Sequence, residues 1–547
     1  MKHNHFLITM KFFKYISIQI FIIFFISGIT FFTYSQESDT VHSDKKKYDS
    51  LNSLDEIVVT ATRTNRLMSQ TPASVSIISR EDIDISSAKN IDDLIMSETG
   101  VQVKRSVGIG EGIPSDIIIR GIPGSFGSSR TLILVDGIPT NANGTPFLIL
   151  NEIPLEAVKS IEIVRGPYSS LYGANAFGGV VNILTHNEYG KPEFNTYVET
   201  TYPFTVLNSY YNKNRSIKTS LKKSGEETYW NFEGFSKGGN DSFHYLISTG
   251  YRTIGNYLLR DYAITKHGED TVHKSRENHD YRDFRIFGKS GITFPNGLDL
   301  EIHGRYFNSE LGFGKTKNII PDSVSVITRG NKKVIGSIVR YHFDNMNTMI
   351  LQAHYRTLTG EFWGEEPLPD TTYAPSYWKS KQKDFRFEAK WGIRAGKAQF
   401  ITFGIEALRN AIHFGEKKIS QTDSTIPGSY DSKDAIYNSA VFFQDEIQLF
   451  EKLNIVPGFR IDYHSIFKAE FSPKLGISYK IVDWLRIRTS AGRAFRAPTL
   501  SELYMPPLTI RPDFLLKANN TLNPEYIWAI DAGIEVLPIQ TFKMRFG

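Results

Sequence analysis

From about residue 194 to the end of the chain, apolar and charged residues alternate along one stretch after another. Between residues 298 and 306, every second residue is apolar or glycine. The residues between them are Asp299, Glu301, His303 and Arg305. Because successive side chains of a β-strand point to opposite faces, this pattern predicts strands with one apolar and one polar face.

Two architectures contain such strands, a soluble β-sandwich and a transmembrane β-barrel. The alternating stretches run for about ten residues, which is long enough to cross a bilayer at a tilt. Short links, such as residues 395–397 and 450–452, alternate with long polar segments, such as residues 360–383 and 416–435. Short turns on one side and long loops on the other are typical of outer-membrane barrels, so we expect the long segments to be extracellular.

Composition argues against several other classes of protein. Aromatic residues make up 13% of the chain, which favours many half-buried strands and aromatic girdles. The net charge of +5 is spread along the chain rather than gathered in a basic patch, so no nucleic acid is expected as a partner. The chain has no Cys, which excludes disulfides, thiol catalysis and Cys-ligated metal sites.

The N-terminal residues predict export from the cytoplasm. Three Lys residues precede an apolar stretch at residues 16–32, and this order is typical of a signal peptide, which we place at residues 1–35. The alternative is an uncleaved membrane anchor, but the stretch is short for a span and contains Ser and Gln. Residues 36–54 are polar and charged, which indicates a disordered periplasmic leader.

The residues between the leader and the alternating region follow a different sequence pattern. Short apolar runs end in Gly or Asp-Gly turns, as at residues 117–122 and 132–139, which fits buried strands with tight reversals. Two of its segments, DEIVVTAT at residues 55–62 and VKSIEIVRGPYSSLYGANAFGGVVNILT at residues 158–185, closely resemble the TonB box and the plug terminus of TonB-dependent receptors.

The alternating region carries further matches to that family. Residues 495–498 read FRAP, and NNTLNPE at residues 519–525 resembles the family's Asn-Pro-Asn-Leu-x-Pro-Glu element. Asn520 and Thr521 depart from this element, whereas its other positions fit. The resemblance implies an α/β plug at residues 65–188 that fills a transmembrane antiparallel β-barrel of about 22 strands.

The chain is short for a barrel of that size. With roughly 20 residues for each strand and its connection, residues 194–547 supply about 17 or 18 strands. An open barrel edge in lipid leaves backbone groups without partners. We therefore expect an incomplete barrel domain whose C-terminal strands are missing.

The resemblance also implies roles for particular residues. A TonB box adds as a strand to the TonB protein of the inner-membrane energising complex, using main-chain hydrogen bonds. In this chain the TonB-binding residues are Asp55, Glu56, Ile57, Val58, Val59 and Thr60. Because buried charges need partners, the family's plug–barrel contacts are assigned to Arg120, Glu162 and Arg165.

The function implied is TonB-dependent active import of a scarce ligand across the outer membrane of a Gram-negative bacterium. We expect a ferric siderophore as the ligand and a monomer surrounded by outer-membrane lipid. Cobalamin is the alternative. Haem is disfavoured, because residues 499–518 lack the His that haem receptors carry between the FRAP and Asn-Pro elements.

Functions of other classes fit the sequence less well. The plug and the TonB box argue against a passive channel or a surface adhesin. No HExxH or Gly-x-Ser-x-Gly motif occurs, so neither an enzyme, a catalytic residue nor a cofactor is expected. The leader at residues 36–54 is too short for a folded signalling domain.

Candidate ligand contacts lie in the long polar segments. Residues 361–378 combine carboxylates with aromatic rings that suit stacking on a ligand, and the aromatic candidates are Trp363, Tyr373, Tyr377 and Trp378. An ordinary polar loop with interface aromatics is the alternative. On the predicted lumen face, we expect His303 and His354 to be solvated residues rather than metal ligands, because no ligand cluster surrounds them in the sequence.

Overall fold

The computed structural model describes residues 57–58, 60, 63, 66–68, 71–105, 115–124, 129–140, 150, 152–187, 189–201, 206–211, 217–222, 229–254, 280–312, 327–344, 347–367, 373–418, 431–450, 452–511, 514–539 and 542–546. The predicted signal peptide and leader, and Asp55, Glu56 and Val59, lie outside the described residues. Among the described residues, no helix is long and apolar enough to span a membrane. Residues Leu54–Gly547 form one compact unit.

The N-terminal part of this unit is a small α/β plug. Its central sheet has the order β3-β8-β9-β6-β7, and β6 and β9 run parallel, whereas the other pairs are antiparallel. The five strands are β3 (Ser74–Ile78), β6 (Thr131–Val135), β7 (Ile138–Pro139), β8 (Val158–Arg165) and β9 (Gly179–Thr185). Two further pairs are β1 (Ile57–Val58) with β2 (Arg66–Leu67), and β4 (Val101–Arg105) with β5 (Ser115–Ile119).

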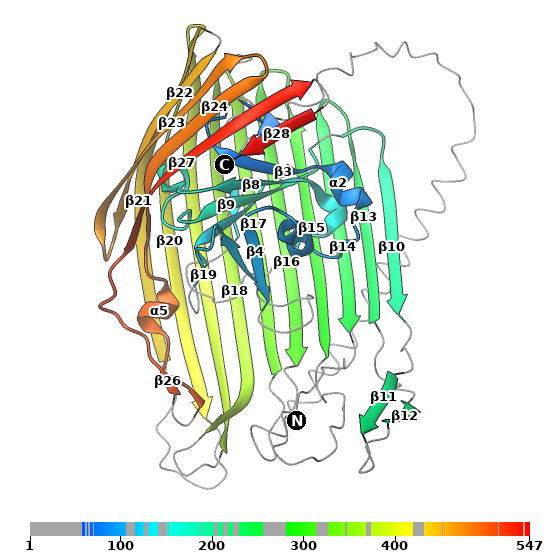
Figure 1. The fold of residues 1–547 in the computed structure, drawn as a ribbon. Helices are drawn as coiled ribbons and strands as arrows, with labels where there is room; N and C mark the ends of the chain where they lie inside the picture. The colour runs from blue at the N-terminus through cyan, green and yellow to red at the C-terminus, as the bar shows by residue number, and fades with distance from the viewer. Residues whose placement is uncertain are drawn as a thin grey trace, which may run out of the picture. The chain divides into compact units, whose positions relative to one another are not determined.

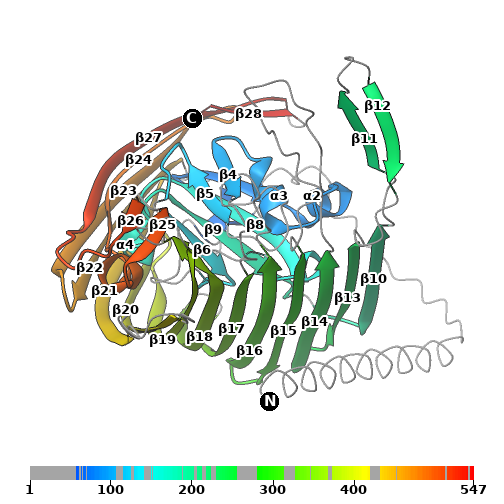
Figure 2. The ribbon, with the colours of Figure 1, turned by 90° about the horizontal axis from the view of Figure 1, so that it is seen from below.

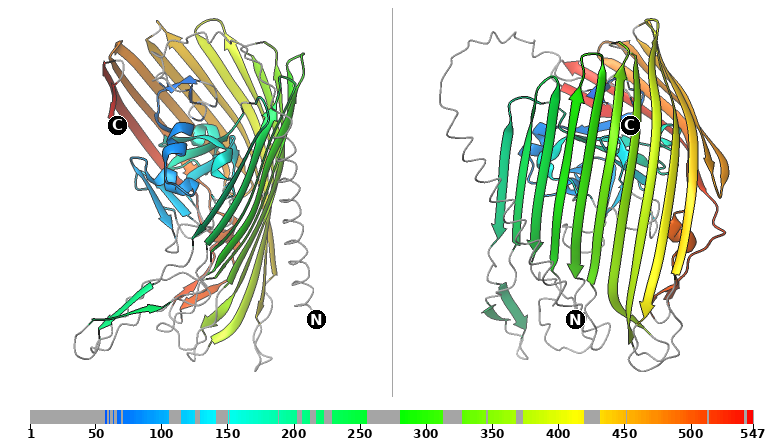
Figure 3. Two further views of the ribbon diagram at one scale, coloured as in Figure 1. Left: turned by 90° about the vertical axis from the view of Figure 1, so that its right-hand side faces the viewer. Right: turned by 180° about the vertical axis from the view of Figure 1, so that it is seen from behind.

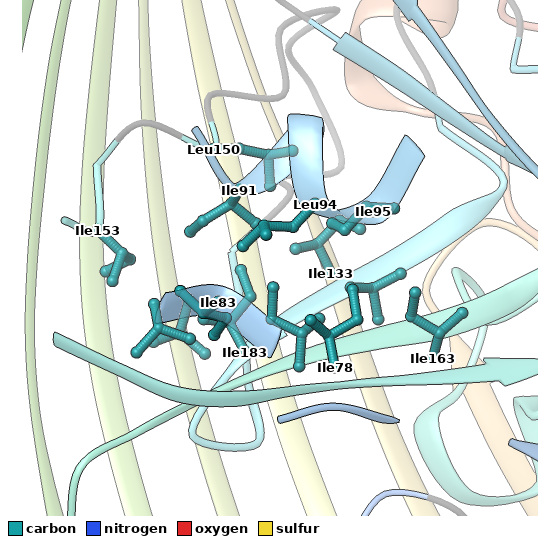
Figure 4. Close-up of a cluster of buried hydrophobic side chains, with 14 of the residues drawn as sticks. Ile78, Ile83, Ile91, Leu94, Ile95, Ile133, Leu150, Ile153, Ile163 and Ile183 are labelled. Atoms are coloured by element: carbon teal, nitrogen blue, oxygen red, sulfur yellow. The ribbon is translucent and has the colours of Figure 1, made fainter. Parts of the chain in front are cut away.

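Short helices complete the plug. They are α2 (Arg80–Ile85), α3 (Ile91–Met96), α4 (Ser169–Tyr172) and the 3-10 helix η2 (Leu155–Ala157). Helix α2 begins at Ser79 because the Ser79 hydroxyl accepts a hydrogen bond from Asp82 N, while the Asp82 carboxylate accepts one from Ser79 N. Aliphatic side chains of α2 and α3 pack with those of the sheet into one buried cluster (Figure 4), which includes Ile83, Ile95 and Ile163.

The C-terminal part is one large antiparallel sheet of 15 strands that pair in sequence order (Figure 1). The first eight are β10 (Glu193–Thr201), β13 (Tyr229–Gly239), β14 (Phe243–Ile254), β15 (Tyr281–Thr293), β16 (Leu298–Gly312), β17 (Ile327–His342), β18 (Thr348–Pro367) and β19 (Tyr373–Ala395). The other seven are β20 (Gln399–Lys418), β21 (Asp431–Leu449), β22 (Leu453–His464), β23 (Lys468–Val482), β24 (Leu485–Arg496), β27 (Glu525–Ile539) and β28 (Phe542–Phe546).

The sheet curves, and the plug lies on its concave side (Figure 2), where numerous side chains join the two. The predicted combination of an α/β plug with a large antiparallel sheet is therefore confirmed. In the sheet order β10 and β28 occupy the two ends, and no pairing between them occurs among the described residues.

The burial pattern of the large sheet is the reverse of that in a soluble protein. Its polar side chains are buried on the inner face, and its apolar side chains are exposed on the outer face. In β16, Ile302 is 62% exposed, whereas its neighbours Glu301 and His303 are 9% and 6% exposed. In β27, Ile530 is 81% exposed, whereas Asp531 is 8% exposed. An outer surface of apolar side chains around a polar interior is stable in lipid, because the hydrocarbon takes the place of water there.

Most strands of the large sheet are longer than the expected ten residues. The segment predicted as a loop at residues 360–383 is largely the paired ends of β18 and β19 (Figure 3), in which Trp363 pairs with Tyr377. The predicted loop at residues 416–435 is likewise shortened by β20 and β21. The strands extend past the membrane-spanning length, because cross-strand hydrogen bonds satisfy the backbone groups in water as well as in lipid.

Four more strands and one helix lie in the connections of the large sheet. They are β11 (Val206–Tyr211), β12 (Ile217–Lys222), α5 (Leu500–Tyr504), β25 (Leu508–Arg511) and β26 (Phe514–Leu516). Helix α5 follows the FRAP sequence and begins at Thr499, whose hydroxyl and backbone form a capping box with Glu502. Leu500 packs with Ile412 and Ile436 of the sheet, so this connection folds back against the wall.

Candidate functional site

A cavity lined by both apolar and polar side chains lies between the plug and the concave face of the sheet. On the plug side its lining residues are Leu132, Ile138, Pro139, Tyr172, Gly173, Ala174 and Asn175. On the sheet side the polar lining residues are His354, Arg356, Asp384, Arg386, Glu406, Asn410, Asn438, Arg460 and His464. A cavity with convergent guanidinium, carboxylate, amide and imidazole groups is suited to a polar ligand.

The charged groups of this wall are held in place by one another. Nε of Arg356 donates to Asp384 over 2.7 Å, and Arg386 donates to Glu406 over 2.6 Å. Arg460 is fully buried and donates to Asp462 and to Glu406. These partly or fully buried pairs have fixed geometry, so the wall presents a preorganised set of donors and acceptors.

The tip of α4 forms the plug side of the cavity. Gly173 ends this helix with a φ of +79°, a conformation that side chains disfavour. A Cβ at Gly173 would lie 3.1 Å from the guanidinium of Arg460, so the missing side chain lets the plug backbone approach the wall closely. Burial raises the pKa of the Tyr172 hydroxyl, which keeps it protonated and able to donate.

The end of the TonB-box segment is fixed inside the plug. Thr60 is fully buried and makes three hydrogen bonds to plug side chains. Its N–H donates to Glu162 over 2.7 Å, its carbonyl accepts from the Tyr172 hydroxyl over 2.9 Å, and its hydroxyl accepts from Asn182 over 2.9 Å. Tyr172 thus contacts Thr60 and lines the cavity, which connects the segment directly to the cavity floor.

The next described residue, Arg63, fixes the same segment to the sheet. Its guanidinium pairs with Glu388 of β19 over 2.9 Å and lies 4.6 Å from the ring centre of Tyr172 and 5.0 Å from that of Phe442. Its backbone carbonyl accepts a hydrogen bond from Lys390. Arg63 was not among the predicted residues, and the sequence signal for it is a single cation directly after an apolar, β-prone segment.

The three predicted plug–barrel residues have different partners. Arg120 pairs with Asp531 of β27, as the assignment expected. Arg165 donates to Ser76, Thr99 and Glu98 of the plug itself, and no barrel hydrogen bond from it occurs among the described residues. Its assigned contact with the barrel stays a prediction.

Glu162 accepts the hydrogen bond from Thr60 described above, and its assigned contact with the barrel stays a prediction. Glu162 and Arg165 are three residues apart in β8. Residues three apart on a strand point to opposite faces, so these two side chains cannot share one partner. The role of Glu162 is therefore linked to the TonB-box segment.

The opposite side of the plug has its own buried anchor. Oε1 of Glu152 accepts hydrogen bonds from Lys332 over 2.9 Å, from Arg305 over 3.2 Å and from the hydroxyl of Thr140 over 2.5 Å. Burial alone would raise the pKa of Glu152, but Lys332 and Arg305 hold it below its ordinary value. The carboxylate is therefore ionised and joins the plug to β16 and β17.

The predicted ligand-contact residues lie on the β18–β19 hairpin. Trp363 and Tyr373 belong to its strands, and their side chains lie outside the described parts. Tyr377 and Trp378 are half-buried on β19, and neither lines the cavity. Among the described residues, no group of three or more His, Cys, Asp or Glu side chains is arranged to hold a metal ion.

Comparison with known proteins places this architecture in a family. The family model described as "TonB dependent receptor-like, beta-barrel" matches residues 165–545, and the "TonB-dependent Receptor Plug Domain" model matches residues 68–180. A probable TonB-dependent siderophore receptor, PirA of Acinetobacter baumannii, is 24% identical over 514 residues, which cover 84% of this chain and 64% of that protein. The chain therefore spans less than two thirds of the length of this relative.

Further similarities agree with the family match. The vitamin B12 transporter BtuB of Vibrio vulnificus is 23% identical over 482 residues, covering 88% of this chain and 67% of that protein. A crystal structure of a mutant ferric enterobactin receptor (PfeA) of Pseudomonas aeruginosa superposes with a TM-score of 0.64 at 19% identity, covering 88% of this chain and 71% of that one.

The family consists of transporters and receptors rather than enzymes, and its members are β-barrel proteins of the Gram-negative outer membrane. The predicted outer-membrane location is therefore confirmed, in agreement with the apolar outer face of the sheet. With a plug at residues 68–180 and a barrel-type sheet over residues 165–545, this chain belongs to the TonB-dependent receptor family.

Proposed function

We propose that this protein imports a ferric siderophore across the outer membrane and that the TonB protein energises the import. Similarity to siderophore receptors supports the choice of ligand class. The observation that carries the mechanism is the connection from Thr60 through Tyr172 to the cavity floor. A force applied to the TonB-box segment reaches the cavity through this connection.

TonB is proposed to act on the short strand β1. Strand β1 pairs Ile57 with Leu67 and Val58 with Arg66, so its backbone is already extended and suited to strand addition by TonB. Pulling on β1 removes Thr60 from Glu162, Tyr172 and Asn182. Each buried polar group left without a partner costs about 1–3 kcal/mol, so this release requires work that TonB supplies.

The ligand is proposed to bind on the extracellular side of the plug and then pass through the cavity. The guanidinium and carboxylate groups of the cavity wall suit an anionic or polar chelate. The aromatic side chains of Trp363, Tyr373, Tyr377 and Trp378 are retained as candidate contacts at the outer hairpin. We propose that the protein acts as a monomer whose apolar outer face contacts outer-membrane lipid, without a nucleic-acid partner.

Growth of a deletion strain tests the proposal. The strain receives the full-length gene as wild type, as Val58→Pro, or as Val58→Thr, which keeps the backbone N–H and the β-branched shape. With a ferric siderophore as the sole iron source, wild type and Val58→Thr are expected to restore growth, and Val58→Pro is not. The proline lacks the donor that strand addition uses.

The same strains distinguish the alternatives. If the gene is required only during cobalamin-dependent growth, the mechanism stands and the imported ligand is cobalamin, as the name of one relative states for that protein. A passive channel or an adhesin needs no TonB, so in that case Val58→Pro would grow as well as wild type.

A further inference from the structure

We propose that His303 and His354 together bind a divalent transition-metal ion on the inner face of the sheet. This site is separate from any siderophore-bound iron, and it does not depend on which ligand the receptor imports. The two residues lie on strands β16 and β18, with Gly336 of the intervening strand β17 between them.

The register of three strands creates the site. His303 is the cross-strand partner of Gly336, and Gly336 is the partner of His354. Adjacent strands are about 4.8 Å apart, so the two histidine backbones are separated by about 9.6 Å. Imidazoles across such a gap meet only when the residue between them has no side chain.

The ring nitrogens converge above Gly336. An ideal Cβ on this glycine would lie 2.3 Å from Nδ1 of His354 and 2.4 Å from Nε2 of His303. The two nitrogens are therefore at most 4.7 Å apart, the sum of these distances, and the ring centres are 5.2 Å apart. Two imidazole nitrogens that bind one ion each lie about 2.0–2.1 Å from it, so they are at most about 4.2 Å apart. A small rotation of either ring therefore brings the two nitrogens within the distance that one shared ion requires.

The nitrogens are buried without a protein partner. His303 and His354 are 6% and 7% exposed. Within the described residues, Nε2 of His303 and both ring nitrogens of His354 make no hydrogen bond. A buried polar group without a partner is costly, and its presence points to an ion or water that binds it. His354 lines the cavity, which gives an ion a route to the pair.

The surrounding charges do not exclude a cation. Basic side chains lie near the pair, but each has a carboxylate partner: Arg305 pairs with Glu152, Lys289 with Asp136, and Arg386 with Glu406. Neutral imidazole suits Cu²⁺, Ni²⁺ and Zn²⁺, and the general order of affinities favours Cu²⁺. The described residues supply no third protein ligand in this arrangement, so water completes the coordination.

Copper binding to the purified full-length receptor tests the site. The protein is dialysed against Cu²⁺, and its copper content and electron paramagnetic resonance spectrum are measured for wild type, His303→Gln, His354→Gln and Gly336→Ala. The alanine methyl occupies the point where the nitrogens converge while leaving both histidines in place. The matched control is His464→Gln, which removes another buried histidine of the inner face.

We expect wild type and His464→Gln to hold one copper ion whose spectrum shows coupling to two imidazole nitrogens. Each of the other three variants is expected to lose this ion and its spectrum. Heat-modifiable migration in gel electrophoresis checks that each barrel is folded. Should Gly336→Ala fail to fold, the losses of copper and of nitrogen coupling in His303→Gln and His354→Gln carry the test.

Two results would overturn the proposal. Copper content and spectrum that stay unchanged in His303→Gln and His354→Gln would place the ion elsewhere on the chain. Absence of a copper signal with nitrogen coupling in the folded wild-type receptor would mean that the pair binds water only.

Discussion

Thr60 is the residue through which the TonB-box segment is joined to the plug. Its backbone and hydroxyl are bound by Glu162, Tyr172 and Asn182, which come from two strands and one helix. Tyr172 also lies against Arg63, whose guanidinium pairs with the sheet. A few side chains therefore determine how firmly the segment is held in the plug.

Removal of the Tyr172 hydroxyl is expected to loosen the segment. In Tyr172→Phe the buried carbonyl of Thr60 loses its donor, which costs about 1–3 kcal/mol locally. Hydrogen–deuterium exchange of a peptide covering residues 54–68 should become faster. Tyr168→Phe is the matched control, because the buried Tyr168 hydroxyl has no hydrogen-bond partner among the described residues. Equal exchange in both variants would contradict the role given to Tyr172.

A second residue-scale prediction concerns pH. Burial, together with the neighbouring Glu233 carboxylate, raises the pKa of Glu156 from 4.5 to about 8. Between these values the folded plug binds a proton that the unfolded plug does not, so plug stability should fall as pH rises from about 4.5 to about 8. Thermal unfolding of the plug at a series of pH values measures this slope.

Glu156→Gln provides the comparison. The amide keeps the shape of the protonated carboxyl and does not titrate, so the slope over this pH range should decrease. A slope that is unchanged in Glu156→Gln would assign the pH dependence to other groups.

At the scale of elements, alternation predicted the strands and their faces correctly. Glu301 and Arg305 were expected on the inner face, and they are buried there. His303 and His354 also lie on that face, but the expectation that they are solvated was wrong, because both are buried. Strand ends could not be predicted in the same way. The hairpin at Trp363 and Tyr377 has the polar and aromatic composition of a loop. Its two halves nevertheless pair with each other and belong to β18 and β19.

Contacts that depend on register were beyond the sequence. His303 and His354 are 51 positions apart, and only the pairing of both with Gly336 brings them together. The contact of Arg63 with Glu388 likewise requires that the plug be docked on the sheet. The plug motif identified Glu162 and Arg165 as charged residues that need partners. Tertiary packing decides which partners they have, and the environments of the two residues differ.

At the scale of the whole plug–sheet unit, the docking charges between β15 and β27 are divided by side, whereas Lys89 of the plug pairs with Glu199 of β10. Plug carboxylates meet cations of β15 to β17, as in the contacts of Asp136 with Lys289 and of Glu152 with Lys332. Plug arginines meet carboxylates of β19 and β27, and these pairs are Arg63–Glu388, Arg120–Asp531 and Arg130–Glu525. This division specifies one orientation of the plug, because a rotated plug would place like charges together.

Loss of the Glu152 charge is expected to weaken this docking. In Glu152→Gln, the buried cations Lys332 and Arg305 lose their carboxylate, and breaking such a pair costs about 3–5 kcal/mol. Calorimetry at pH 7 should show a lower unfolding temperature for the plug. Glu156→Gln is the control, since Glu156 is already protonated at that pH and should change little. Similar shifts in the two variants would argue against Glu152 as a charged anchor.

In the proposed mechanism, ligand transport requires strand addition at the TonB box, whereas ligand binding does not. Cells that produce wild type, Val58→Thr or Val58→Pro receive iron-55 bound to a siderophore that supports growth through the wild-type gene, and surface-bound and internal counts are measured separately. We expect equal surface binding in all three and internal accumulation in wild type and Val58→Thr alone. Accumulation by Val58→Pro at the wild-type rate would contradict TonB-driven import through this segment.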